Sequence, residues 1–392
     1  MTEREQKIDE LLSRGVAEVI GGDELRRRLL AGEKLRVKLG IDPTSPNIHL
    51  GRAVALRKLR DFQDLGCEVH FIIGDFTGVI GDTSDKESER PMLSEAVVEE
   101  NLKTYFEQAY KILDREKTVE HRNSEWLSKL SLKEVSGLAT GFSLHEFIAR
   151  ENIRKRLDEG KRISLREVLY PLMQGYDSVM TEADVEIGGT DQRFNILAGR
   201  TLQFSFGKNP QSIILMNLIL GTDGRKMSSS WGNTINLLDG PNDMFGKVMS
   251  IPDELIGSYF VHCTRVVMAD VEEIMKAENP RDAKVRLARE IVTLYHGADA
   301  AAKAEEYFVN TFSKKEIPED IAELRIGDGT GIIDVIMSAG FAETRSDARR
   351  KIEQGGVELG GERITDWNFS ISSDRSGKVL KVGKKDFVRI VF

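Results

Sequence analysis

Two segments combine glycines with cations or with a histidine, as phosphate-binding sites do. The first, GTDGRKMSSSWGN at 221–233, puts Arg225 and Lys226 among three serines and three glycines, directly after an apolar run. Cations on a mobile loop can close on phosphate groups and release them afterwards. A solvated basic turn would have the same composition, so this segment alone does not decide the chemistry.

The second segment, IDPTSPNIHLGR at 41–52, joins a proline-stiffened loop to the start of a predicted helix. His49 precedes the first turn, and Gly51 lets a ligand approach the backbone. The unpaired N–H groups and the dipole of a helix N-terminus attract phosphate, and His49 adds a donor. An ordinary helix cap is the alternative interpretation.

A third segment, YPLMQGYD, predicts a pocket for a polar ligand. Tyr170, Gln174 and Asp177 are spaced i, i+4 and i+7, which places them on one face of a helix. A hydroxyl, an amide and a carboxylate are costly to bury on an otherwise apolar face unless they are satisfied. They therefore favour a polar ligand, although an amphipathic surface helix would also fit.

The elements that carry these segments predict an α/β fold with a Rossmann-like parallel sheet. Residues 35–41 and 69–74 read as strands on either side of a helix at 50–66, a right-handed βαβ unit. The loop that follows the first strand then lies at its carboxyl end, where ligands collect in open α/β sheets. Residues 95–185 read as mostly helical, and 186–220 return to a βα pattern.

The rest of the chain predicts a helical region and a small basic module. A helix ending at Gly297 has one apolar face, made by Val285, Ala288, Ile291, Val292 and Tyr295. The polar stretch 326–331 is expected to be a linker. Residues 331–392 hold 11 Lys+Arg and 9 Asp+Glu, with a Thr344-capped basic helix, a hairpin at Gly360-Gly361 and a closing strand pair.

Bulk composition limits the class of protein. The chain has 392 residues, 40% hydrophobic, with a net charge of −8, so any contact with nucleic acid must be local. Its two cysteines form no paired motif, which argues against a disulfide framework or a thiolate metal site. The charged N-terminus and the absence of a long apolar run predict a soluble, cytoplasmic protein.

Taken together, the motifs resemble those of class I aminoacyl-tRNA synthetases. HLGR corresponds to the HIGH signature and KMSSS to the KMSKS signature, in the expected order and context. Y-x-x-x-Q-x-x-D is similar to the pattern of tyrosyl-tRNA synthetases, and the likeness to the bacterial members covers essentially the whole chain. The resemblance implies ATP with Mg²⁺, L-tyrosine and tRNA(Tyr) as ligands, no resident metal, and a homodimer.

The resemblance also assigns roles to individual residues. The residues implied to be catalytic are His49, Arg52, Lys226, Thr44, Lys86 and Arg90. Those implied to bind tyrosine are Asp82, Tyr170, Gln174, Asp177 and Gln192, with Asp177 accepting the phenol hydroxyl. Those implied to bind ATP are Gly40, Asp42, His49, Gly51, Gly189, Asp191, Lys226, Met227 and Ser228.

The basic module is similar to the alpha-L RNA-binding domain. Arg345, Arg349, Arg350, Lys384 and Lys385 are the residues that this resemblance places against tRNA. The implied organisation is a catalytic domain at 1–222 that includes a helical connective region. The KMSSS loop and a helical anticodon-binding domain follow at 223–325, and the alpha-L domain occupies 331–392.

Two positions depart from the family signatures, and a third distinguishes two bacterial subgroups. Arg52 replaces the second histidine of HIGH, and Ser229 replaces the second lysine of KMSKS. One hypothesis is that Arg52 compensates for the missing lysine; the alternative is that Arg52 points to solvent and KMSSS is a tolerated variant. Lys38 stands where another bacterial subgroup has a tyrosine that contacts the phenol hydroxyl, so the second partner of that hydroxyl is not identified.

The implied reaction is adenylation of tyrosine followed by transfer to the end of tRNA. The substrate carboxylate is already a nucleophile, so the protein must supply positioning and positive charge. Two rival functions stay open: a tryptophan-specific synthetase, and an RNA-binding protein that has kept the scaffold without catalysis. A nucleotidyltransferase with an HxGH-type loop is a third, disfavoured by the RNA-binding module.

Overall fold

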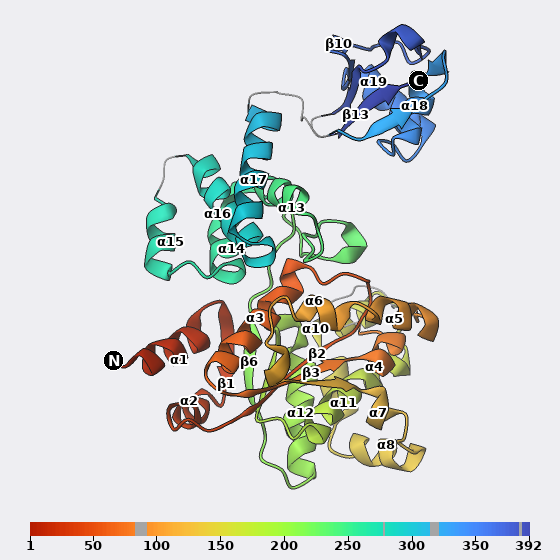
Figure 1. Ribbon diagram of the computed structural model, residues 1–392. Coiled ribbons are helices and arrows are strands. Elements are labelled where there is room, and N and C mark those ends of the chain that lie inside the picture. Colours follow the sequence, from red (N-terminus) through yellow and green to blue (C-terminus); the bar gives the residue numbers. More distant parts are fainter. Residues whose placement is uncertain (83–91, 277–278, 314–320, 384–385) are drawn as a thin grey trace. The chain divides into compact units, whose positions relative to one another are not determined.

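The computed structural model describes residues 1–82, 92–276, 279–313, 321–383 and 386–392 (Figure 1). The chain folds as two compact units, Met1–Gly297 and Ala298–Phe392. The predicted domain limits at 222, 325 and 331 stay predictions. No helix in the described ranges is long and apolar enough to cross a membrane.

The first unit is built on a six-stranded sheet in the order β1-β6-β5-β2-β3-β4. Its strands are β1 (Val16–Ile20), β2 (Arg36–Ile41), β3 (Glu68–Ile73), β4 (Thr118–Arg122), β5 (Val185–Gly189) and β6 (Ser212–Met216). All neighbours are parallel except β1, which pairs antiparallel with β6. The chain winds from β2 toward β4 and later from β5 toward β6. The direction therefore reverses between β2 and β5, which is where ligands bind in such sheets.

Helices cover both faces of this sheet (Figure 1). The predicted βαβ unit is confirmed: α3 (Leu50–Asp64) joins β2 to β3 and packs on the sheet through buried Leu56, Leu59 and Phe62. On the other face α11 (Leu165–Met180) packs against α12 (Arg193–Ser205). A Cβ at Gly175 would lie 3.0 Å from the backbone of Gly199, so the missing side chain lets these two helices approach closely.

The region between β3 and β5 is mostly helical, as expected, but it also contains β4. Its helices are α4 (Asp75–Ile80), α5 (Glu95–Leu102), α6 (Tyr105–Ala109), η1 (Arg115–Lys117), α7 (Ser124–Leu127), α8 (Leu132–Ala139), α9 (Leu144–Ile148) and α10 (Glu151–Asp158). β4 was not predicted, because TVEHR, at the edge of the sheet, has one strongly apolar residue, Val119, which is itself exposed.

The first unit has further helices before β2, after β5 and after β6. They are α1 (Glu3–Ser13), α2 (Gly22–Leu30), η2 (Thr190–Gln192), η3 (Ser229–Trp231), α13 (Pro241–Met249), η4 (Asp253–Leu255), α14 (Ile256–Cys263), α15 (Met268–Ile274) and α16 (Pro280–His296). The predicted apolar face of α16 is buried, except that Val285 is only partly covered. Arg57 of α3 donates hydrogen bonds to the Tyr295 hydroxyl of α16 and the His262 carbonyl of α14.

The second unit has its own apolar core and a five-stranded sheet in the order β10-β9-β12-β13-β7. Its elements are α17 (Ala298–Phe308), η5 (Val309–Ser313), β7 (Glu323–Arg325), β8 (Thr330–Gly331), α18 (Ile332–Ser338), α19 (Arg345–Glu353), β9 (Val357–Leu359), β10 (Glu362–Arg363), β11 (Ser370–Ile371), η6 (Ser373–Arg375), β12 (Val379–Val382) and β13 (Asp386–Val391). The Thr344 cap, the hairpin between β9 and β10 and the closing pair of β12 with β13 are confirmed. The stretch expected to be a linker, 326–331, lies inside this unit instead. Its last two residues form β8, which pairs with β11, and β7 just before it pairs with β13.

Candidate functional site

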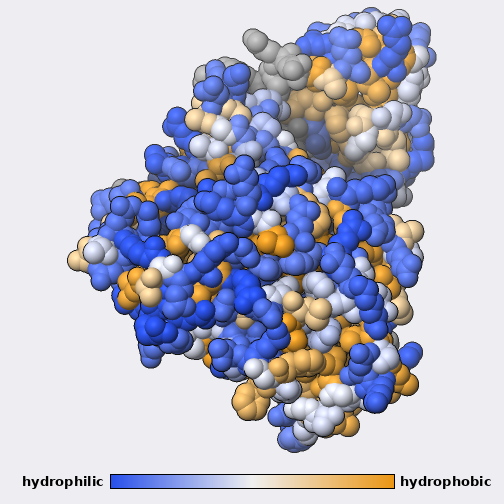
Figure 2. Space-filling view, turned by 60° about the horizontal axis from the view of Figure 1, so that its bottom comes forward, coloured by the Kyte–Doolittle hydropathy of each residue, from blue (hydrophilic) through white to orange (hydrophobic). Residues whose placement is uncertain are grey.

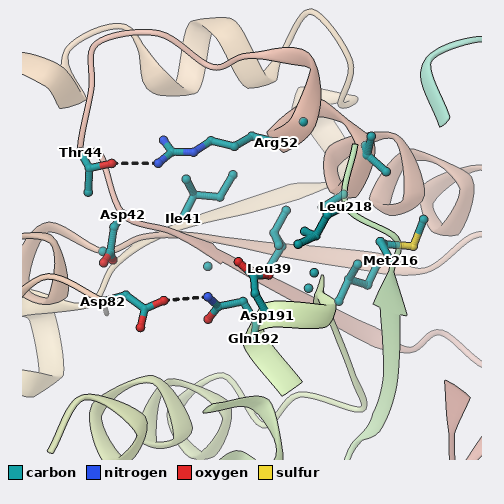
Figure 3. Close-up of a pocket in the computed structure, with 18 of the residues that line it drawn as sticks. Leu39, Ile41, Asp42, Thr44, Arg52, Asp82, Asp191, Gln192, Met216 and Leu218 are labelled. Carbon is teal, nitrogen blue, oxygen red and sulfur yellow. Dashed lines mark hydrogen bonds between the residues drawn. The ribbon is translucent and has the colours of Figure 1, made fainter. Parts of the chain in front are cut away.

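A single cavity of about 280 Å³ lies at the carboxyl ends of β2 and β5 (Figure 3). Its wall combines the loop after β2, the first turn of α3, one face of α11, the turn after β5 and the loop at 226–230. His49, Lys226 and Asp177 all line it, although they are far apart in the sequence. The three segments singled out by residue type therefore converge on one space.

His49 precedes α3 and is buried, with only 7% of its surface exposed. Its side chain makes no capping hydrogen bond, and its Nδ1 atom has no partner. Burial lowers the pKa of His49 to about 3, with the cations of Arg52 and Lys226 acting in the same direction. A Cβ at Gly51 would lie 3.0 Å from the His49 Nδ1 atom. By its backbone His49 is the N-cap residue of α3, but its imidazole is neutral and has a nitrogen without a hydrogen-bond partner instead of a capping hydrogen bond.

Arg52 lies in the cavity wall and does not point to solvent (Figure 3). Its guanidinium donates to the Thr44 hydroxyl at 2.9 Å and to the Tyr105 hydroxyl of α6. Ser229 shares a hydrogen bond of 3.1 Å with the hydroxyl of Ser45. The two departures from the signatures thus contact adjacent residues of one loop.

The loop at 221–233 is held in place by Asn233. The Asn233 amide donates to Asp223 at 2.7 Å and accepts from the Ser228 N–H at 2.8 Å. Gly221 leaves room for this contact, because a Cβ there would lie 2.4 Å from the Asn233 carbonyl. The loop is therefore ordered by contacts that its glycine and serine content did not predict.

The two cations of this loop have different environments. Lys226 lines the cavity and forms an ion pair with Asp191 at 2.9 Å. Met227 is buried, and its sulfur lies 3.3 Å from the backbone nitrogen of Gly51. Arg225 pairs with Asp223 outside the cavity wall and covers the ring of Trp231 at 4.7 Å. Of the two, Lys226 is the cation that faces the cavity.

The predicted polar face of α11 points into the cavity. Tyr170 donates to the Asp42 carboxylate at 2.8 Å, and burial raises the pKa of its hydroxyl. Asp177 is almost completely buried and accepts hydrogen bonds from Trp126 Nε1 at 2.8 Å and Asn123 Nδ2 at 3.3 Å. Burial raises the pKa of Asp177 to about 7 in spite of these donors. A carboxylate in this setting gains from a further hydrogen-bond donor supplied by a ligand.

The opposite wall is formed by Asp82 and by the turn after β5. Gln192 donates to Asp82 at 2.7 Å, and the two side chains point toward one another (Figure 3). A Cβ at Gly189 would lie 2.4 Å from the Asp191 carboxylate, so the glycine permits that carboxylate to fold back over the backbone. Gly40, Asp42, Thr44 and Ser228 complete the predicted residues found in the wall.

Several residues of this site were not predicted from the sequence. Asn123 and Thr77 line the cavity, and Asn123 donates to the Thr77 hydroxyl at 2.9 Å. Thr77 in turn donates to Asp42 at 2.7 Å, and a Cβ at Gly74 would lie 2.1 Å from the same carboxylate. Asn123 could have been found from its place in the chain. It directly follows β4, so it lies at the same edge of the sheet as the loops that follow the other parallel strands.

Two predicted catalytic residues, Lys86 and Arg90, and two predicted tRNA contacts, Lys384 and Lys385, lie outside the described residues. Their roles stay predictions.

Comparison with known proteins identifies the family. The family model described as tRNA synthetases class I (W and Y) matches residues 30–313. The chain belongs to the class I tRNA synthetases. The model of the C-terminal domain of tyrosine–tRNA ligases matches residues 313–390 of this synthetase chain. The predicted family and fold class are confirmed.

Similar synthetases cover the whole chain. The tyrosine–tRNA ligase of Thermotoga maritima is 47% identical over an alignment of 396 positions, which spans 100% of this chain and 98% of the relative. That of Carboxydothermus hydrogenoformans is 48% identical over an alignment of 400 positions, which spans 98% of this chain and 97% of the relative. A solved structure, a C-terminally truncated mitochondrial tyrosyl-tRNA synthetase of Coccidioides posadasii, is similar with a TM-score of 0.63. It is 25% identical and covers 77% of this chain and 91% of that one.

In the second unit of the synthetase, α19 presents the predicted basic residues. The side chains of Arg345, Arg349 and Arg350 are at least half exposed. Each forms an ion pair with a carboxylate of the same unit, and Arg349 also covers the Trp367 ring at 4.2 Å. Exposed pairs of this kind are weak, so these cations can exchange their carboxylates for phosphates.

Proposed function

We propose that the chain is a tyrosine–tRNA ligase that forms tyrosyl-adenylate from tyrosine and ATP and then transfers tyrosine to tRNA(Tyr). The observation that carries the proposal is the shared cavity, which has His49 and Lys226 in one part of its wall and buried Asp177 in another. The first pair suits a triphosphate and the carboxylate suits a phenol hydroxyl. The names of the full-length relatives and of the matching C-terminal domain support the same activity.

The tyrosine end of the cavity is selective because Asp177 is buried. Tyrosine offers its hydroxyl to Asp177, whereas phenylalanine would leave the carboxylate short of a donor and without water. Tyr170, Gln174 and Asp82 are assigned to the substrate ammonium group, and Gln192 to its carboxylate. The Asn123 amide, which contacts Asp177 and lines the cavity, is a candidate for the second partner of the phenol hydroxyl.

The ATP end supplies neutral and positive groups where negative charge develops. Neutral His49 and the N-terminus of α3 bind phosphate oxygens, and the cations of Lys226 and Arg52 stabilise the departing pyrophosphate. Asp191 and Gly189 are assigned to the ribose and adenosine. Magnesium enters bound to the phosphates of ATP. Since the substrate carboxylate is the nucleophile, no side chain has to remove a proton from it.

Pyrophosphate exchange into ATP, measured with each amino acid in turn, tests this proposal. Exchange that depends on tyrosine alone is the expected result. Exchange with tryptophan would favour the tryptophan-specific alternative, and no exchange with any amino acid would favour an RNA-binding protein without catalysis. A reaction without added amino acid provides the background.

We also propose that the enzyme is a homodimer joined through apolar side chains on α8–α12. This part of the first unit exposes large apolar residues; they are Leu132, Leu144, Ile148, Leu157, Leu165, Leu169, Met180, Phe204 and Phe206. Figure 2 shows apolar surface on the face turned forward. Leu132, Leu165 and Phe204 are 83%, 78% and 74% exposed. Many large apolar side chains exposed in one region of a folded protein are typical of an interface, and a second copy is the occupant proposed here.

Light scattering during gel filtration tests the dimer. Leu165→Glu is expected to convert the dimer to a monomer, because a carboxylate at an apolar interface is costly. Val267→Glu is the matched control, since Val267 is 63% exposed on a different helix, α15, where it precedes the first turn. A wild-type chain that elutes as a monomer would contradict this proposal.

A further inference from the structure

A lysine and a glutamate form a fully buried ion pair between β2 and β5. The side chains of Lys38 and Glu186 are 0% and 2% exposed, and the Lys38 Nζ atom lies 3.0 Å from a Glu186 oxygen. The two residues are partners in the register of the parallel strands. They therefore lie at the point where the winding of the sheet reverses, next to the cavity that Glu186 helps to line.

The pair is bonded to α11 on both sides of Asp177. Lys38 donates to the Gln174 carbonyl at 3.0 Å and to the Ser178 hydroxyl at 2.7 Å. Ser178 donates in turn to Glu186 at 3.0 Å. Stability does not require an ion pair here, because well-packed apolar residues of similar volume are often as stable as a buried pair. The specific contacts with α11 point to a different role.

We propose that Lys38 and Glu186 are positioning residues for substrate selection: they fix the part of α11 that carries Gln174 and Asp177, and Lys38 keeps a positive charge behind the Asp177 carboxylate. The inference rests on the proposed tyrosine specificity, because it concerns the phenol end of that pocket. Neither residue is assigned contact with the reacting atoms. Both act through α11.

The charges around Asp177 have opposite effects on its carboxyl group. Burial is the largest influence and raises the pKa of Asp177, whereas the charge of Lys38 lowers it. Glu186 raises that pKa, and the hydrogen bonds from Trp126 and Asn123 lower it. Tyr170, on the same helix, is a further titratable group that senses Asp177. Removal of Lys38 and removal of Glu186 should therefore shift the ionisation of Asp177 in opposite directions.

The experiment measures pyrophosphate exchange as a function of pH for Lys38→Met and Glu186→Gln. In Lys38→Met the KM for tyrosine is expected to rise about tenfold at neutral pH, with the KM for ATP nearly unchanged. The acidic limb of the kcat/KM profile for tyrosine is expected to move to higher pH by about one unit. This is the lower limit of the pKa shift that loss of a neighbouring opposite charge causes. In Glu186→Gln the same limb is expected to move to lower pH.

Lys58→Met is the matched control, because Lys58 is also buried and bonded to backbone carbonyls, those of Leu11 and Arg14, away from the cavity. It should change thermal stability without changing the pH profile for tyrosine. If Lys38→Met does not fold, the Glu186→Gln profile decides the question alone. Unchanged profiles in the folded variants, or shifts of the same sign, would overturn the inference. Absence of tyrosine-dependent exchange in the wild type would instead overturn the proposed function.

Discussion

The carboxylate of Asp177 offers the sharpest test of how the pocket selects its amino acid. Asp177→Asn keeps the shape of the side chain but removes its charge. In the wild type the carboxylate accepts hydrogen bonds from two donors, Trp126 Nε1 at 2.8 Å and Asn123 Nδ2 at 3.3 Å. The substitution replaces one of the two accepting oxygens with an NH₂ group, which is itself a donor. The substitution therefore weakens the acceptor for the phenol hydroxyl and disturbs its neighbours, while the ATP end of the cavity is left unchanged.

Two magnitudes follow for Asp177→Asn. A hydrogen bond to a charged group contributes about 1.5–3 kcal/mol, so kcat/KM for tyrosine should fall roughly 10- to 150-fold. Phenylalanine makes no such bond, and its kcat/KM should change little. Tyrosyl-tRNA synthetases are themselves the reference case for this discrimination, on the order of 10⁵, so one hydrogen bond accounts for only part of it.

The pH dependence gives a second, independent magnitude. Because the pKa of Asp177 is raised from 3.8 to about 7 in the folded protein, the wild type binds a proton there that the unfolded chain releases. The contribution of Asp177 to the free energy of unfolding is therefore fully present below pH 4 and is lost as the pH rises to 7. The loss is on the order of 4 kcal/mol. This slope in the free energy of unfolding should be absent in Asp177→Asn.

Pyrophosphate exchange with tyrosine and with phenylalanine, and urea unfolding between pH 4 and 8, provide the two measurements. Asp184→Asn is the matched control, because Asp184 is a partly buried carboxylate of the first unit, paired with Arg28 and outside the cavity wall. A variant of Asp177 that keeps the wild-type ratio of tyrosine to phenylalanine activity would refute the assignment of the phenol site. A wild-type pH slope that persists in Asp177→Asn would refute the assignment of that proton.

Three further predictions concern the ATP end and the tRNA contacts. In a double-mutant cycle of Arg52→His and Ser229→Lys, measured on pyrophosphate exchange, the double variant should lose less activity than the two single effects predict; additive effects would reject compensation. Asp191→Asn should raise the KM for ATP about tenfold while the KM for tyrosine stays within about twofold, and an equal rise in both would contradict the ribose assignment. Arg345→Glu with Arg350→Glu should raise the KM for tRNA about tenfold without changing pyrophosphate exchange, and should reduce the salt dependence of aminoacylation; an unchanged KM for tRNA would remove these residues from the interface.

The parts of the site that could be predicted are those that follow buried parallel strands. The loops that carry His49 and Asp191 come after apolar runs with a clear strand pattern, and parallel strands bring their carboxyl ends together. Tyr170 and Asp177 were found because helical spacing alone puts them on one face. Local sequence was sufficient in both cases.

The parts that could not be predicted depend on distant pairing. Trp126 and Asn123 follow an edge strand that has almost no apolar pattern, so nothing local indicated that they reach Asp177. Lys38 stands in a strand where alternation would have allowed it to be exposed. Its burial depends on Glu186, which is brought beside it only by the register of β2 with β5.

The contact of Lys226 with Asp191 has a consequence for how the enzyme meets its nucleotide. The carboxylate proposed to bind the ribose is paired with the ammonium group proposed to bind the phosphates. On these proposed roles, the pair competes with ATP, and the apparent affinity for ATP is reduced by the fraction of molecules in which the contact is closed. A ribose that takes the carboxylate then releases the lysine beside the triphosphate, so that, on the same proposal, recognition of the sugar prepares the cation for the chemistry.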